Sequence, residues 1–219
     1  MNVFYEEEGV FKIGAILADN TTSLQVEAPH GKRSKIKAAS VLLRFDAPPL
    51  SEFLHFAQKT ADDLDLNFLW ECCASDTEFA SDALAADYFG HAPSPVEAAA
   101  VLIRLHAAPM YFYKKGRGRY KAAPPEALKA ALASQEKKRL QAEQQSRYVK
   151  LLTAFILPDE FRPLLSDLLY RPDKNTVEWK ALDVACTAAK LNVPRLLEKC
   201  GVIPSSHDYH FNRFLLENF

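Results

Sequence analysis

The feature that most constrains the fold is a strongly marked helix start in front of a basic hairpin, within residues 94–121. Ser94, Pro95 and Glu97 place serine at the N-cap, proline at the first helical position and glutamate at the third. This arrangement is a capping box with a preset backbone angle, which stabilises a helix by about 1 kcal/mol. The sequence therefore predicts a helix over the apolar stretch that follows, ending before Pro109.

The hairpin is predicted in residues 110–121, directly after that helix. Aromatic residues lead into a Gly-Arg-Gly centre, and the chain returns through Tyr120. Glycine supplies the positive-φ conformations that a tight loop between two strands needs. Five cations fall within eight residues: Lys114, Lys115, Arg117, Arg119 and Lys121. A cationic hairpin behind a helix is typical of the wing of a winged helix-turn-helix, and it indicates contact with nucleic acid.

The charges of the chain are segregated, although its formal net charge is only −1. Residues 52–97 hold ten acids and one base, whereas residues 98–125 hold six bases and no acid. The local field, rather than the total charge, steers a polyanion to a surface. We therefore predict a nucleic-acid site at the five hairpin cations together with Tyr120. Two alternatives stay open: the hairpin is charged only for solubility, or it is buried against the acidic segment 52–97.

A winged-helix module is predicted over residues 51–123, with the basic wing at 110–123. Three helices precede the hairpin helix; Ser51 is a candidate cap for the first, and Ser75 or Asp76 for a third that stops at Gly90. The helix at the recognition position is almost entirely Ala, Val, Leu and Ile over residues 98–106. A helix that reads base edges normally offers Arg, Asn, Gln or Ser. Phosphate contacts by the wing, and RNA rather than an operator sequence, are therefore expected.

Residues 1–46 predict four or five short strands, because apolar and β-branched runs alternate with turn residues. Such a set suggests a small β-barrel of SH3-like or OB-like type, joined to the next module by the linker 47–50. One strand carries a second group of cations without an acid: Lys32, Arg33, Lys35 and Lys37. With a period of two, the last three share one face. A second nucleic-acid contact and an ordinary solvated strand are both open here.

Residues 125–219 predict a helical region, so that the whole chain is classed as α+β, mostly α. No Gly or Pro interrupts the stretch from 126 to about 157, which predicts a long helix with a polar middle. Short helices are predicted at 159–170, 176–191, 194–199 and from 206 towards 218. The last one is crowded with apolar residues, which indicates either a docking or self-association surface or a core helix. These residues are Tyr209, Phe211, Phe214, Leu215 and Phe219.

Several functional classes find no support in the sequence. No apolar run approaches the ~20 residues that span a bilayer, and the acidic N-terminus is unlike a signal peptide, so a cytoplasmic protein is expected. The four cysteines suit neither a disulfide framework nor a zinc site. No phosphate-binding glycine loop and no nucleophile elbow is present. We therefore predict no catalytic residue and no metal ligand.

Three stretches resemble the N-terminal region of a bacterial subgroup of ribonuclease II-type (RNB family) 3′–5′ exoribonucleases. They are residues 11–19, 24–37 and 204–215, and the resemblance spans nearly the whole chain in the same order of parts. It implies a protein that degrades RNA to nucleoside monophosphates. Mg²⁺ is then held by aspartates of a central catalytic domain, and accessory modules bind the RNA.

The chain also departs from that family. The aspartate-rich stretch and the C-terminal S1 barrel are missing, and residues 1–46 lack the aromatic stacking motifs of cold-shock barrels. No catalytic residue is therefore carried over, and Mg²⁺ is expected only for the absent catalytic domain. We expect an RNA-binding accessory region, inactive alone, whose partners are single-stranded RNA and that domain. It would be an expressed piece, a proteolytic fragment or a natural truncation. The alternatives are a winged-helix DNA-binding transcription regulator and a protein-interaction scaffold.

Overall fold

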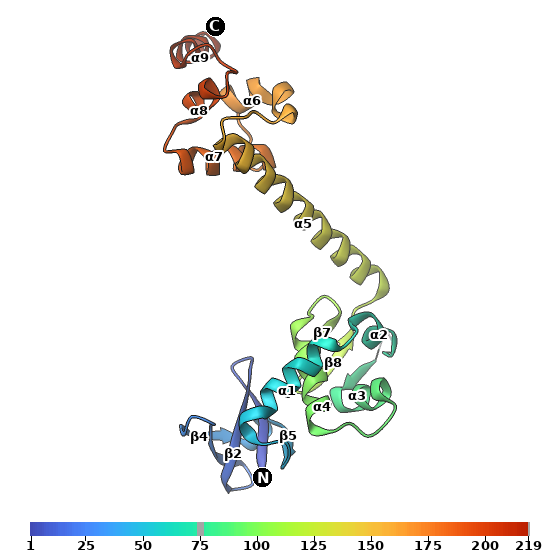
Figure 1. Ribbon diagram of the computed structural model, residues 1–219. Helices are drawn as coiled ribbons and strands as arrows, with labels where there is room; N and C mark the ends of the chain where they lie inside the picture. The colour runs from blue at the N-terminus through green and yellow to red at the C-terminus, as the bar shows by residue number, and fades with distance from the viewer. Residues whose placement is uncertain (74–76, 219) are drawn as a thin grey trace. The chain divides into compact units, whose positions relative to one another are not determined.

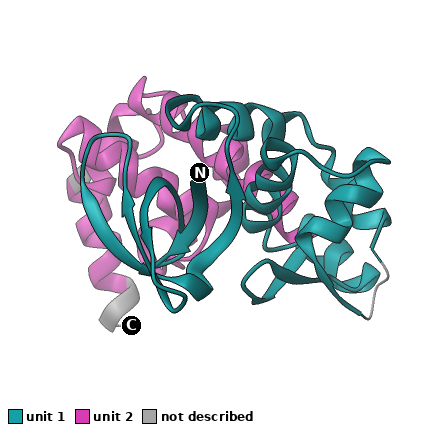
Figure 2. Cartoon of the chain, turned by 90° about the horizontal axis from the view of Figure 1, so that it is seen from below, with its two compact units in different colours: residues 1–132 teal, residues 133–219 magenta. Residues whose placement is uncertain are grey.

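The computed structural model describes residues 1–73 and 77–218. It divides the chain into two compact units, residues 1–132 and 133–219, drawn in teal and magenta in Figure 2. The fold is mostly helical with two antiparallel sheets (Figure 1), which agrees with the predicted α+β class. No helix within the described residues is both long and apolar enough to cross a membrane.

The first sheet has five strands in the order β4-β3-β2-β1-β5. They are β1 (Asn2–Glu7), β2 (Val10–Asp19), β3 (Ser23–Glu27), β4 (Arg33–Lys37) and β5 (Val41–Phe45). The predicted strands are present, but the predicted barrel is not supported, because the sheet is not closed: β4 and β5 are its two edges. The 3-10 turn η1 (Ala38–Ser40) carries the chain from one edge to the other. Strand spacing predicts how many strands form, but not whether the two edges meet.

The two faces of this sheet bury different residues, because side chains alternate along each strand. One face holds a small cluster of its own: Val3, Tyr5, Leu24, Val26 and Ile36. The other face packs on helix α1 (Leu50–Asp63), where the ring of Phe45 stacks on Phe53 with centroids 3.8 Å apart. Residues 1–46 therefore share one hydrophobic core with the module that follows, inside the unit 1–132.

The order of elements after residue 49 is that of a winged helix. Helices α1 and α2 (Leu66–Glu71) are followed by strand β6 (Glu78–Ala80), α3 (Ser81–Phe89) and α4 (Pro95–Ala107). The hairpin of β7 (Phe112–Gly116) and β8 (Arg119–Ala122) completes a sheet in the order β6-β8-β7. Strand β6 was not predicted.

The predicted capping box is confirmed at α4. The Ser94 Oγ accepts a hydrogen bond from the Glu97 amide at 3.3 Å, and the Glu97 carboxylate accepts one from the Ser94 amide at 2.8 Å. The prediction that Ser51 caps the first helix is wrong, because α1 begins at Leu50 and Pro49 occupies the N-cap position. The candidate caps Ser75 and Asp76 lie outside the described residues. The predicted helix stop at Gly90 is confirmed, since α3 ends at Phe89 and Gly90 is its C-cap, in the left-handed conformation.

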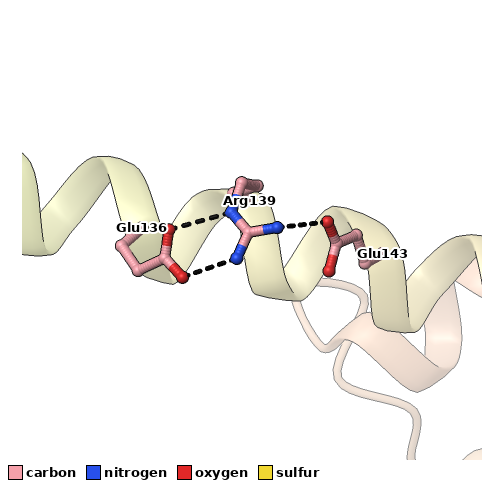
Figure 3. A network of polar contacts seen from close by, with 3 residues as sticks. All are labelled: Glu136, Arg139 and Glu143. Atoms are coloured by element: carbon pink, nitrogen blue, oxygen red, sulfur yellow. Dashed lines mark hydrogen bonds and ion pairs between the residues drawn. The ribbon is translucent and has the colours of Figure 1, made fainter.

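Helix α5 (Pro125–Thr153) begins in the first unit and ends in the second. Its predicted polar middle is exposed and carries a network along one side, shown in Figure 3. Arg139 donates two hydrogen bonds to the Glu136 carboxylate, at 2.7 and 2.8 Å, and also pairs with Glu143 one turn further on. These bonds lower the pKa of Glu136. Pairs at such spacings stabilise a helix whose middle has no packing partner.

The unit 133–219 is a cluster of short helices around the end of α5. They are η2 (Asp159–Leu164), α6 (Leu165–Tyr170), α7 (Val177–Ala189), α8 (Val193–Lys199) and α9 (Ser206–Asn218), close to the predicted ranges. The core forms around Tyr148 of α5, whose ring meets Phe161 edge-on at 5.0 Å. In α9, Tyr209 is buried and stacks on Tyr170 at 5.6 Å. The apolar side chains that follow it are exposed: Phe211, Phe214 and Leu215.

Candidate nucleic-acid interface

The wing is an irregular hairpin whose tip spans residues 115–119. Strands β7 and β8 pair in register at Phe112–Ala122, Tyr113–Lys121 and Lys114–Tyr120, and then shift before the pair Gly116–Arg119. The shift leaves Lys115 as an extra residue, a β-bulge that turns its side chain away from the regular alternation. Gly118 has φ +60°, a conformation that explains glycine at the centre of the basic run.

One face of the wing belongs to the core. Phe112, Tyr120 and Ala122 are buried, as strand alternation requires for residues that share a face. Burial, with a smaller contribution from the charge of Glu6, raises the pKa of the Tyr120 hydroxyl to about 12. Tyr120 was predicted as part of the nucleic-acid site. Its ring instead packs inside the unit 1–132, and it is not part of the exposed cationic surface.

Lys114 lies on the same face of the hairpin and forms an ion pair with Glu6 of β1. The side chain of Glu6 is only 11% exposed in this pair. The charge of Lys114 is therefore largely neutralised by the N-terminal sheet. Of the five predicted wing cations, this one serves to join the wing to β1.

Three other wing cations face solvent: Lys115, Arg117 and Arg119. Within residues 1–73 and 77–218, none of the three has an ion-pair partner. Lys121 is half-buried, and in the register of the sheet it stands between Tyr113 of β7 and Glu78 of β6. The acidic segment 52–97 thus reaches the base of the wing through Glu78, but it leaves the three cations at the tip uncovered.

The second predicted group lies on β4, an edge strand of the N-terminal sheet. Lys32, Arg33, Lys35 and Lys37 are all exposed, and Ile36 between them is buried on the opposite face, as the alternation predicted. Arg33 forms an ion pair of 2.7 Å with Glu27 on the neighbouring strand β3. The positive charges of Lys35 and Lys37 are therefore less neutralised by neighbouring acids than the charge of Arg33.

Helix α4 offers little to a nucleic acid, since it serves the core. Its buried residues are Ala99, Ala100, Val101, Leu102 and Leu105. The helix packs against α1, which explains why its sequence carries so few polar side chains. The exposed cations of this module therefore lie on the wing rather than on the buried face of the helix in front of it.

The tip of the wing is held in place by a neighbouring element, which the sequence did not indicate. The Gly118 carbonyl accepts a hydrogen bond of 2.8 Å from the Ser81 amide at the start of α3. A side chain at Gly118 would contact Leu42 of β5 at 3.8 Å. The three exposed cations thus project from a supported loop, and no sequence signal could have identified partners so distant in the chain.

In the part of the chain that the structure describes, no group of three or more His, Cys, Asp and Glu side chains is arranged to hold a metal ion. The histidines of α9, His207 and His210, belong to no such group.

Comparison with known families gives a match to part of the chain. The family "Ribonuclease II, winged helix domain" matches residues 52–127, which cover α1 to the first turn of α5 and include the whole wing. No curated protein and no solved structure matches the chain. Residues 52–127 are thus similar to the winged helix of ribonuclease II, and the match says nothing of the residues on either side.

Proposed function

We propose that this protein is an RNA-binding accessory region of a ribonuclease II-type 3′–5′ exoribonuclease, and that it is not catalytic by itself. The observation that carries the proposal is the tip of the wing. Lys115, Arg117 and Arg119 are exposed there without ion-pair partners among the described residues. They lie within the segment that matches the ribonuclease II winged helix. An accessible cluster of one sign binds a polyanion through its phosphates.

The contacts expected are to the sugar–phosphate backbone. Helix α4 has its apolar side chains in the core and so has few polar groups for base edges in a major groove. Phosphate contacts fix the position of a strand without reading its sequence. Single-stranded RNA is the expected ligand, because a flexible strand can follow a small basic surface.

The experiment is a binding titration by fluorescence anisotropy with three single-stranded RNAs of equal length and different sequence. The wing variant Lys115→Ala/Arg117→Ala/Arg119→Ala should bind all three RNAs more weakly, by a similar factor. The control Lys137→Ala/Lys138→Ala/Lys150→Ala removes the same charge from exposed positions on α5. It should bind like the parent protein.

Two results would contradict this proposal. Equal losses in both triple variants would mean that only net charge matters, and the wing would not be the site. Tighter binding to one duplex DNA sequence than to any RNA would favour the alternative of a DNA-binding regulator.

The non-catalytic part of the proposal rests on the sequence, in which no position matches a catalytic residue of the exoribonuclease family. Purified protein with Mg²⁺ or Mn²⁺ should leave 5′-labelled single-stranded RNA at full length on a denaturing gel. Release of mononucleotides that copurifies with the protein through successive columns would overturn it.

A further inference from the structure

A cleft of about 260 Å³ lies beside the wing tip, between elements from distant parts of the unit 1–132. One wall is strand β5, another is the start of α3, and the wing tip and α4 complete it. The residues that matter for its chemistry are Leu42, Ser81, Asp82, Ala98, Arg117 and Arg119. We call it the β5–wing cleft.

Ser81 offers an unpaired hydroxyl to the cleft. Its side chain lines the cleft, yet the residue is only 6% exposed. Its amide donates to Gly118, but its hydroxyl makes no hydrogen bond within the residues that the structure describes. The hydroxyl is not one of the fully buried side-chain atoms without a partner among the described residues, so it stays accessible from the cleft. A ligand in the cleft would supply that partner.

The walls combine apolar and charged surface in a particular way. Val41, Leu42 and Leu43 give one apolar side, and Ala98 and Leu102 of α4 give another. Charged groups stand at the start of α3 and on the wing. Such walls suit a flat ligand with apolar faces and a polar edge.

The charged groups distinguish a nucleotide from a plain hydrophobic ligand. The guanidinium groups of Arg117 and Arg119 can bind phosphate oxygens or stack on a base. One carboxylate oxygen of Asp82 accepts a hydrogen bond from the Ala83 amide at 2.9 Å, and the other can accept from a base N–H group. The negative charge of Asp82 would repel a phosphate group, so the cleft is unsuited to a ligand that consists of phosphate alone.

The size of the cleft is consistent with a small ligand. Sites for drug-sized molecules usually measure roughly 300–1,000 Å³, and this cleft is slightly smaller. It has room for one base with its sugar outside, but not for a stack of several.

From these observations we infer that the β5–wing cleft receives a single unstacked base of the bound RNA strand. The two wing arginines hold the flanking phosphates, and the Ser81 hydroxyl and the Asp82 carboxylate contact the polar edge of the base. This inference rests on the proposed function and adds a base-binding subsite to a surface that otherwise contacts only phosphates.

The test compares an RNA oligonucleotide with a ribose–phosphate strand of equal length that lacks bases. The parent protein should bind the RNA about tenfold more tightly, a factor that corresponds to 1.4 kcal/mol. Ala98→Leu places a larger side chain in the cleft on a helix that tolerates leucine. This variant should bind both strands equally and keep the salt dependence of the parent.

The matched control is Ala107→Leu, at an exposed position of the same helix outside the cleft. It should keep the preference for RNA over the strand without bases. Ser81→Ala should lower that preference without abolishing it. Thermal melting of each variant shows whether the fold is retained.

If Ala98→Leu does not fold, photocrosslinking of an RNA containing 4-thiouridine gives a second measurement. Crosslinked peptides should contain residues 41–43 or 98–102 in the parent protein. Crosslinks confined to other segments would overturn the inference.

The possible failures are separable. Binding with a normal salt dependence but with no preference for bases, or an unchanged preference in Ala98→Leu, overturns the base subsite and leaves the proposed function intact. Absence of binding to either strand overturns both.

Discussion

Lys114 in strand β7 forms an ion pair with Glu6 in strand β1, across 108 residues of chain. This pair divides the cations of the wing into two groups. Lys114 neutralises a nearly buried carboxylate of the N-terminal sheet, whereas Lys115 beside it sits on the β-bulge and is exposed. Adjacent lysines therefore have different surroundings.

The first prediction uses this pair of neighbours. Lys114→Ala should lower the free energy of unfolding by about 1 kcal/mol, because Glu6 loses its partner, and should change the salt dependence of RNA binding little. Lys115→Ala should leave stability unchanged and reduce that salt dependence. Urea denaturation and salt titrations of both variants test this. The reverse pattern would show that Lys114, rather than Lys115, contacts the nucleic acid.

The second prediction concerns alkaline pH. The pKa of Tyr120 is raised to about 12 in the folded protein, from a usual value of 10.0, so the folded state holds its proton more tightly than the unfolded state. The resulting stabilisation is complete below pH 10 and is lost as the pH rises towards 12. In Tyr120→Phe the stability should fall less steeply over this range. Identical slopes in urea melts of the two proteins from pH 9.5 to 11.5 would contradict the assignment.

The third prediction concerns the start of α4. Ser94→Ala removes the side-chain cap of the helix and should destabilise the protein by about 1 kcal/mol. Ser51→Ala is the matched control, because Ser51 lies inside the first turn of α1 and is not its cap. The denaturant concentration at the midpoint of unfolding should therefore be lower for Ser94→Ala than for Ser51→Ala. Equal midpoints would mean that the capping box contributes nothing measurable.

The fourth prediction concerns α9, where Phe211 is 57% and Leu215 is 39% exposed. Exposed apolar side chains on one helix face favour association, so the mass measured by light scattering should rise with protein concentration. Phe211→Ser/Leu215→Ser should abolish the rise. Ile156→Ser/Val184→Ser, at exposed apolar positions elsewhere in the same unit, should keep it. A parent protein that stays monomeric at all concentrations would mean that this face has no such role.

Local signals in the sequence predicted much of the fold. The cap at Ser94, the stop at Gly90 and the turn at Gly118 each depend on a few neighbouring residues, and all three are present. The predicted helix ranges in residues 159–218 were close to the observed ones for the same reason.

Features that depend on distant residues were missed. Strand β6 is three residues long and follows an acidic helical pattern, and it exists because it pairs with β8. The pairing of Lys114 with Glu6 and the β5–wing cleft join elements that lie far apart in the chain. The sequence also could not show that Tyr120 faces the core, because an aromatic residue in a basic hairpin fits either face of a strand.

The most direct test of the central claim is the slope of log K against log[salt] for single-stranded RNA. Each phosphate contact contributes about 0.7 to this slope. If Lys115, Arg117 and Arg119 each contact a phosphate, the wing variant that replaces all three with alanine should have a slope shallower by about 2. A slope equal to that of the parent protein would contradict the account, and would direct attention to Lys35 and Lys37 on β4.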